Sequence, residues 1–163
     1  MRQDQKGFSL IELLVVVAII LIIAAIAIPN FMRARMSAHE SSAAASLRTI
    51  NTAEMSYATT YPTVGFTALA SLGGAQPCTP AAATGCFIDN FLATNGGGTG
   101  KDGYNFAITG VPSTVSYTST ALPVSPNQTG TRAFCSDQTG VIYYDNAGGG
   151  TGCVPGGTTS VLQ

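Results

Sequence analysis

Residues 6–29 read KGFSLIELLVVVAIILIIAAIAIP, and this stretch decides the fold. No polar side chain occurs from Leu13 to Ile28. With the apolar residues just before Leu13, the stretch is about 20 residues long, close to what an α-helix needs to cross roughly 30 Å of hydrocarbon. We therefore expect a membrane-spanning helix at the start of the chain.

Glu12 interrupts this apolar pattern, four positions after Phe8. An ionised, unpaired carboxylate inside hydrocarbon costs about 2.5 kcal/mol or more, so Glu12 requires a proton or a partner. A secretory signal peptide has an apolar region of about 7–15 residues and then a small-residue cleavage site. Here the run is longer, and Pro29 follows it without such a site. A plain membrane anchor fits the length but gives no reason for Glu12 or Gly7.

The combination of Gly7–Glu12 with an apolar run that stops at Pro29 resembles the processing signal and N-terminal helix of the type IV pilins and pseudopilins. The resemblance covers residues 6–61. It implies that a prepilin peptidase cleaves between Gly7 and Phe8 and that the new amine of Phe8 is methylated. The apolar helix then stays on the mature protein.

Glu12 gains a role from this processing. Cleavage frees the α-amine of Phe8, which keeps its positive charge when methylated. If the helices of neighbouring subunits stack with an axial offset, the amine of one reaches the Glu12 carboxylate of the next. A buried ion pair contributes register more reliably than net stability. We therefore predict that Glu12 recruits and aligns the incoming subunit; the alternative is a protonated carboxyl that the bilayer tolerates.

The charges near the helix bear on its orientation. The leader, residues 1–7, carries two cations and one anion, and basic residues before a first apolar helix favour a cytoplasmic N-terminus. Arg33 and Arg35 weaken this bias, whereas the cysteines and the polar remainder favour export. The formal net charge is −1, and loss of the leader makes it −2, which gives no electrostatic case for nucleic-acid binding. We expect a single-pass inner-membrane precursor.

The helix is predicted to have two parts, a transmembrane or filament-core part at residues 8–29 and an amphipathic continuation at residues 30–61. Pro29 lacks an amide hydrogen and clashes with the carbonyl of Ala25, which predicts a kink or loosening there. Pro62 is expected to end the helix, about 80 Å from its start. In the second part, positions for a packed face recur at steps of three and four: Leu47, Ile50, Glu54, Tyr57 and Tyr61. Charged residues are available for the opposite face: Arg33, Arg35, Glu40 and Arg48.

Residues 62–163 are predicted to form an exported globular domain. Charge almost vanishes there, and aromatic and β-branched residues recur at alternating spacing. This pattern predicts antiparallel strands at 104–108, 115–117, 132–134 and 141–144, with residues 62–101 as an irregular connection. The fold class is therefore α+β, a long N-terminal helix whose second half packs on a small antiparallel sheet. The same arrangement is implied by the resemblance, as the pilin "lollipop".

Four cysteines, Cys78, Cys86, Cys135 and Cys153, allow three pairings, and sequence alone does not choose among them. We prefer local pairing, Cys78 with Cys86 and Cys135 with Cys153. The second bridge resembles the C-terminal cysteine loop of many pilins. A metal site or reduced thiols are disfavoured because the spacing fits no zinc pattern and no histidine accompanies the cysteines.

Other motifs do not point to catalysis or metal binding. The loop Asn95–Asp102 resembles a phosphate loop but lacks the leading glycine and has Asp102 where a magnesium-binding hydroxyl belongs. Asp137 and Asp145 flank the last hairpin, but they are too few to favour calcium over a plain turn. The single histidine has no nearby nucleophile, so we expect no enzyme, no cofactor and no metal.

The resemblance implies a structural subunit that polymerises into a type IV pilus filament for adhesion, twitching motility or DNA uptake. The alternative is a pseudopilin of a type II secretion system, in a short periplasmic fibre. A membrane-anchored binding or enzymatic domain with a prepilin signal is a third reading. The implied partners are further copies of the chain in a helical filament, a prepilin peptidase and methyltransferase, and membrane lipid before assembly. The resemblance also implies an inner-membrane assembly machine with a cytoplasmic ATPase as a partner.

Overall fold

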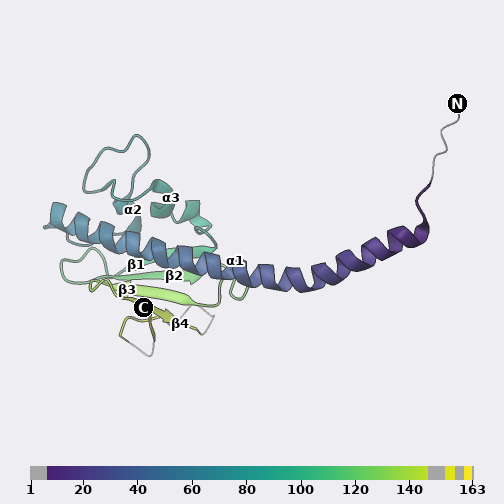
Figure 1. Ribbon diagram of the computed structural model, residues 1–163. Helices are drawn as coiled ribbons and strands as arrows, with labels where there is room; N and C mark the ends of the chain where they lie inside the picture. Colours follow the sequence, from purple (N-terminus) through teal and green to yellow (C-terminus); the bar gives the residue numbers. More distant parts are fainter. Residues whose placement is uncertain (1–6, 147–152, 157–159, 163) are drawn as a thin grey trace. The chain divides into compact units, whose positions relative to one another are not determined.

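The structure is a computed structural model that describes residues 7–146, 153–156 and 160–162 (Figure 1). The chain divides into two compact units, Met1–Arg35 and Met36–Gln163. The long helix α1, Leu10–Thr60, contributes to both units. The two units are described in turn.

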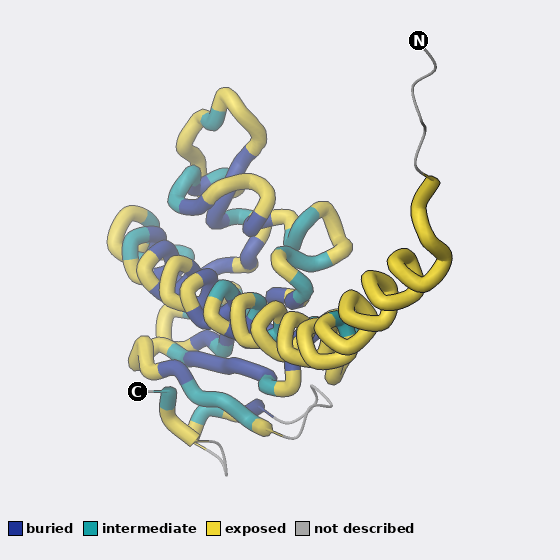
Figure 2. The backbone as a smooth tube through the Cα atoms, turned by 45° about the vertical axis from the view of Figure 1, so that its right-hand side comes forward, coloured by how far each residue is buried: buried dark blue, intermediate teal, exposed yellow. Residues whose placement is uncertain are grey.

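The first unit contains the apolar start of α1. From Gly7 to Arg35 every side chain is exposed except that of Ala24, which is partly exposed (Figure 2). α1 holds an 18-residue window of mean hydropathy 3.3, none of it buried, which is long and apolar enough to cross a membrane. A continuous apolar surface of this size requires lipid or protein around it.

Pro29 does not interrupt α1. The helix is continuous from Leu10 to Thr60, so the kink or loosening expected at this proline does not break it in the single chain. Proline removes one hydrogen bond, that to the carbonyl of Ala25. The neighbouring sequence is rich in alanine, arginine and methionine, which are strong helix formers, and these hold the helix on both sides.

The second unit combines the rest of α1 with an antiparallel sheet. In the described residues the sheet has the order β1-β2-β3-β4-β5, a simple meander in which each strand pairs with the next. The strands are β1 (Tyr104–Thr109), β2 (Thr118–Pro123), β3 (Ala133–Asp137), β4 (Ile142–Asp145) and β5 (Ser160–Val161). The connection from α1 to β1 carries three short helical turns, α2 (Leu69–Leu72), α3 (Asn90–Ala93) and η1 (Gly96–Gly98). The α+β fold class is confirmed.

One predicted strand lies in the wrong place. We expected a strand at 115–117, but β2 begins at Thr118. Oγ of Ser113 accepts hydrogen bonds from the backbone N–H groups of Val115 and Ser116, at 3.1 and 3.3 Å, and so holds these residues in a turn. The other three predicted strands overlap β1, β3 and β4, whereas the two-residue strand β5 was not predicted.

The core lies between α1 and the sheet. The predicted packed face of α1 is buried at Leu47, Ile50, Glu54 and Tyr57. The three apolar or aromatic side chains among them form one cluster with residues of the sheet and of the α1–β1 connection: Leu72, Leu92, Tyr104, Phe106, Ala121, Phe134 and Ile142.

A buried polar network crosses this interface. Nδ2 of Asn51 donates to Oγ of Ser136 at 2.7 Å. Its Oδ1 accepts from the hydroxyl of Tyr117 at 3.1 Å and from that of Ser119 at 3.3 Å. Because buried amides must find partners, Asn51 fixes the position of α1 over β2 and β3.

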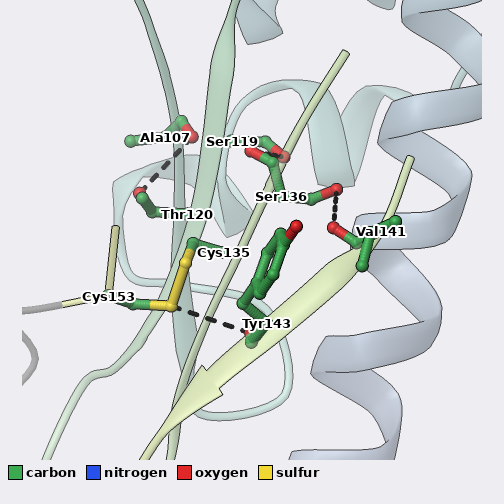
Figure 3. The surroundings of a disulfide bond; sticks show 8 residues. All are labelled: Ala107, Ser119, Thr120, Cys135, Ser136, Val141, Tyr143 and Cys153. Atoms are coloured by element: carbon green, nitrogen blue, oxygen red, sulfur yellow. Dashed lines mark hydrogen bonds between the residues drawn. A yellow bond between two sulfur atoms is a disulfide. The ribbon is translucent and has the colours of Figure 1, made fainter. Parts of the chain in front are cut away.

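The four cysteines form two bridges, Cys78–Cys86 and Cys135–Cys153, which is the local pairing preferred from the sequence. Figure 3 shows the second bridge, which ties the central strand β3 to Cys153 beside Tyr143 of β4. Both of its cysteines are buried. This bridge therefore holds the C-terminal segment against the sheet.

Replacing both Cys135 and Cys153 by alanine is expected to lower the free energy of unfolding by about 3 kcal/mol. The closed loop has a sequence separation of 18, and the bridge restricts the unfolded chain accordingly. The matched double variant at Cys78 and Cys86 opens a loop with a sequence separation of 8 and is expected to lose about 2.5 kcal/mol. Urea unfolding of the full chain in detergent measures both; a loss below about 1 kcal/mol for the longer loop would contradict this account.

Candidate functional site

The residues of the predicted processing site lie at the exposed beginning of the chain's first unit. Phe8 is 87% exposed and stands two positions before the first residue of α1. The carbonyl of Ser9 accepts the backbone N–H groups of Glu12 and Leu13, at 3.1 and 3.3 Å, and so starts the helix. Gly7 lies in the open, and a side chain added at its Cα would meet no atom within 4 Å.

Glu12 lies in the first turn of α1 and is exposed. A carboxylate at a helix N-terminus is favoured by the helix dipole, by about 0.3–1 kcal/mol. Within the described part of the chain, no side chain donates a hydrogen bond or forms an ion pair with it. Its carboxylate is therefore available to a second molecule.

The helix surface around and beyond Glu12 is apolar on all sides. A helix of this kind is buried in a membrane or in a larger assembly. The exposed large side chains include Leu13, Leu14, Val15, Val16, Val17, Ile19, Ile20, Leu21, Ile22, Ile23, Ile26 and Ile28. Pro29 follows these residues without ending the helix, and Phe31 and Met32 beyond it are also exposed.

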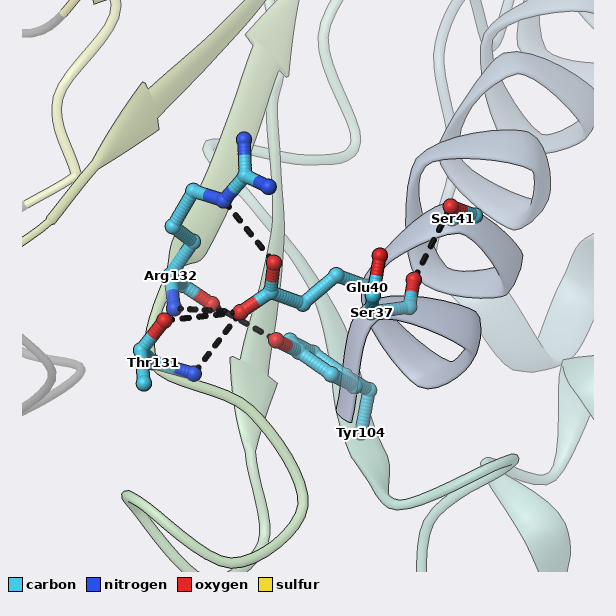
Figure 4. Close-up of polar contacts among 6 residues, drawn as sticks. All are labelled: Ser37, Glu40, Ser41, Tyr104, Thr131 and Arg132. Carbon is cyan, nitrogen blue, oxygen red and sulfur yellow. Dashed lines mark hydrogen bonds and ion pairs between the residues drawn. The ribbon is translucent and has the colours of Figure 1, made fainter. Parts of the chain in front are cut away.

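The second unit holds a different buried carboxylate, that of Glu40 (Figure 4). Its Oε1 accepts from the N–H of Thr131 at 2.8 Å, the hydroxyl of Thr131 at 2.9 Å and the N–H of Arg132 at 3.2 Å. Its Oε2 accepts from Nε of Arg132 at 2.8 Å. The Arg132 guanidinium also lies over the ring of Tyr144, 5.5 Å from the centroid. This Glu40 clamp joins α1 to the start of β3.

The electrostatics of the Glu40 clamp favour the ionised form. Burial alone would raise the pKa of Glu40, but the hydrogen bonds from Thr131 and Arg132 and the charge of Arg132 bring the pKa below its ordinary value. We assigned Glu40 to the outer face of the helix, and this was wrong, since only 5% of it is exposed. Glu40 lies seven residues before Leu47, in phase with the packed face, and that spacing was the available signal.

Two motifs that we did not assign to catalysis or metal binding, the Asn95–Asp102 loop and Asp137, make structural hydrogen bonds. Asp137 accepts from the backbone N–H of Thr139 at 2.9 Å and shapes the turn between β3 and β4. Oδ1 of Asn95 accepts from the N–H of Phe106 at 2.7 Å and ties the glycine-rich loop to β1. Among the described residues, no group of three or more histidine, cysteine or acidic side chains gathers.

The first part of the chain is similar to known proteins. Residues 2–28 match the family model of the prokaryotic N-terminal methylation motif. The type IV major pilin protein PilA of Myxococcus xanthus is 50% identical over 52 residues, 32% of this chain and 24% of the relative. The first part of the chain is therefore similar to the N-terminal segment of type IV pilins.

A second pilin shares the same segment. The type IV wide pilus major component PilA4 of Thermus thermophilus is 55% identical over 38 residues, 23% of this chain and 29% of that protein. The matches thus span about a quarter of the length of these curated pilins. No solved structure matches the chain. Gly7, Phe8 and Glu12 fall inside the methylation motif, and Pro29 directly follows it.

Proposed function

We propose that the mature chain, from Phe8 onward, is a structural subunit that polymerises into a type IV pilus filament. The observation that carries this proposal is the helix start, which is exposed and apolar on every side and holds in its first turn Glu12, a carboxylate with no ion pair among the described residues. Residues 8–29 first anchor the precursor in the membrane and later pack with the same helix of other copies. Residues 62–163 form the exported domain.

The apolar surface by itself does not drive assembly out of a membrane. Lipid tails are as apolar as leucine or isoleucine, so moving α1 from lipid to a helix bundle gains little from the hydrophobic effect. An unpaired carboxylate in lipid is costly, however, and this cost is relieved when Glu12 meets the amine of Phe8 on a neighbouring subunit. Glu12 thereby gives assembly its direction and its register, and close packing of the helices supplies cohesion.

The proposed partners follow from the same steps. A prepilin peptidase removes residues 1–7 after Gly7, and a methyltransferase modifies the amine of Phe8. Lipid of the inner membrane surrounds the single-pass precursor, whose N-terminus is cytoplasmic. An inner-membrane machine then adds subunits to the filament, which ends at the cell surface and serves adhesion, twitching motility or DNA uptake.

Electron microscopy of cells labelled with antibody against residues 62–163 tests the proposal. We expect long surface fibres decorated along their length, and their loss when the chain is deleted. Short fibres confined to the periplasm would overturn the pilus in favour of a pseudopilin. Label spread over the membrane without fibres would overturn polymerisation altogether and favour an anchored binding domain.

A further inference from the structure

Glu54 is a fully buried carboxyl on α1, and the proposed polymerisation does not use it. Its Oε2 accepts one hydrogen bond, from the backbone N–H of Thr67 at 3.0 Å. Its Oε1 has no hydrogen-bond partner among the described residues. An ionised carboxylate so poorly solvated is costly, whereas the neutral acid tolerates a dry site far better.

Comparison with Glu40 shows why the ionised form of Glu54 is poorly stabilised. Both glutamates lie on the same helix and both are buried. Glu40 receives hydrogen bonds from Thr131 and from Arg132, including the guanidinium. Glu54 receives one backbone N–H, and no cation among the described residues contributes to its pKa. The pKa of Glu40 is lowered and that of Glu54 is raised. Because both lie on α1, this difference in pKa follows from the number and charge of their donors.

Residues 61–67 lead from the end of α1 to Thr67, and Phe66 and Thr67 of this segment are buried. The segment leaves α1 through a turn in which the carbonyl of Tyr61 accepts the N–H groups of Val64 and Gly65, both at 3.0 Å. Phe66 then pairs with Ser113 through two backbone hydrogen bonds, of 2.7 and 3.2 Å. Thr67, directly after this pair, donates to Glu54.

We propose that Glu54 is a pH-sensitive latch, whose protonated form keeps residues 61–67 packed on α1 and whose ionised form releases them.

The direction of the pH effect follows from the two states. Burial raises the pKa of Glu54 from 4.5 to about 7, and the hydrogen bond from Thr67 opposes this only partly. The closed state is therefore fully favoured below pH 4.5, and this advantage is lost as the pH rises to about 7. Above that range no further loss is expected from Glu54.

The groups that face Glu54 do not reverse this sign. Tyr117, from the loop before β2, is a titratable group whose pKa is influenced by the charge of Glu54, and its hydroxyl donates to Asn51 of α1. Burial raises the pKa of Tyr117 above its ordinary value, and the charges of Glu54 and Asp137 raise it further. Tyr117 therefore stays neutral across the range in which Glu54 titrates.

Amide hydrogen exchange of residues 61–67 tests the latch in the full chain in detergent micelles. Comparison of the wild type with Glu54→Gln at each pH cancels the intrinsic pH dependence of exchange. The opening of the wild-type segment, relative to the variant, is expected to increase about 30-fold from pH 5.5 to 8.5. A ratio that does not change with pH would overturn the proposal.

A second measurement does not depend on the folding of Glu54→Gln. The chain has three glutamates, Glu12, Glu40 and Glu54, so selective ¹³C labelling of glutamate carboxyls gives few signals. In a Glu12→Gln protein two signals remain, and one is expected to titrate near pH 7. If neither titrates above pH 6, Glu54 is ionised in the closed state and the latch does not exist.

Discussion

Replacing Glu12 by alanine is expected to abolish fibres while the chain still accumulates in the membrane with both disulfides formed. The substitution leaves the proposed amine of Phe8 without its partner at each joint between subunits. Removing one member of a buried ion pair costs about 3–5 kcal/mol, so each subunit addition weakens by about 100-fold or more. Sheared-fibre yield, compared with the total amount of the chain in the cell, measures the loss.

Two control variants separate charge from packing. Glu12→Gln keeps the size and polarity of the side chain but not its charge, and is expected to fail like alanine. Val17→Ala removes apolar volume from the same exposed surface and is expected to assemble nearly normally. Normal fibre yield from Glu12→Ala would refute the recruiting role of this carboxylate.

Replacing Glu40 by alanine is expected to lower the free energy of unfolding by about 2–3 kcal/mol. The change removes the acceptor for two backbone N–H groups, one hydroxyl and the guanidinium of Arg132. Loss of these charge-assisted hydrogen bonds accounts for most of this cost, because the donors on Thr131 and Arg132 are partly accessible to water. Urea unfolding of the full chain in detergent provides the measurement, with Thr131→Ser as a control that retains the hydroxyl.

The pH dependence of the same variant gives an independent check. Because the folded-state pKa of Glu40 is lowered, its contribution is present above the ordinary value of 4.5 and is lost as the pH falls through the lowered pKa. The wild type is therefore expected to lose this stability in acid, and Glu40→Gln is expected to lack that component. A loss below about 1 kcal/mol for Glu40→Ala at pH 7 would contradict the clamp.

Local pattern in the sequence is enough to predict the main elements of the fold. The apolar run predicts the exposed first part of α1, since composition alone identifies such a helix. The spacing of Leu47, Ile50 and Tyr57 predicts the face that packs on the sheet, because helical periodicity is a local property. Alternation of apolar side chains likewise predicts β1, β3 and β4.

The buried polar residues that we did not predict are explained by distant contacts. Glu40 is buried because Thr131 and Arg132, 91 and 92 residues away, supply its donors. Asn51 is buried because Ser136, 85 residues away, pairs with it. A polar side chain at a helical position favours the surface unless such partners exist, and only the folded chain brings them together.

The candidate processing and assembly residues could be predicted from the sequence because they do not depend on distant contacts. Gly7, Phe8 and Glu12 form a short contiguous motif, and their proposed chemistry requires a peptidase and a second subunit, not a tertiary pocket. The structure adds that Glu12 and Phe8 are exposed at the start of α1.

The central claim is that the apolar helix remains on the mature chain and joins copies of it into a fibre. Intact mass spectrometry of the chain from purified surface fibres tests this most directly. We expect a polypeptide that begins at Phe8, carries one added methyl group and contains two disulfides. A chain that begins after Pro29, or that retains residues 1–7, would contradict it.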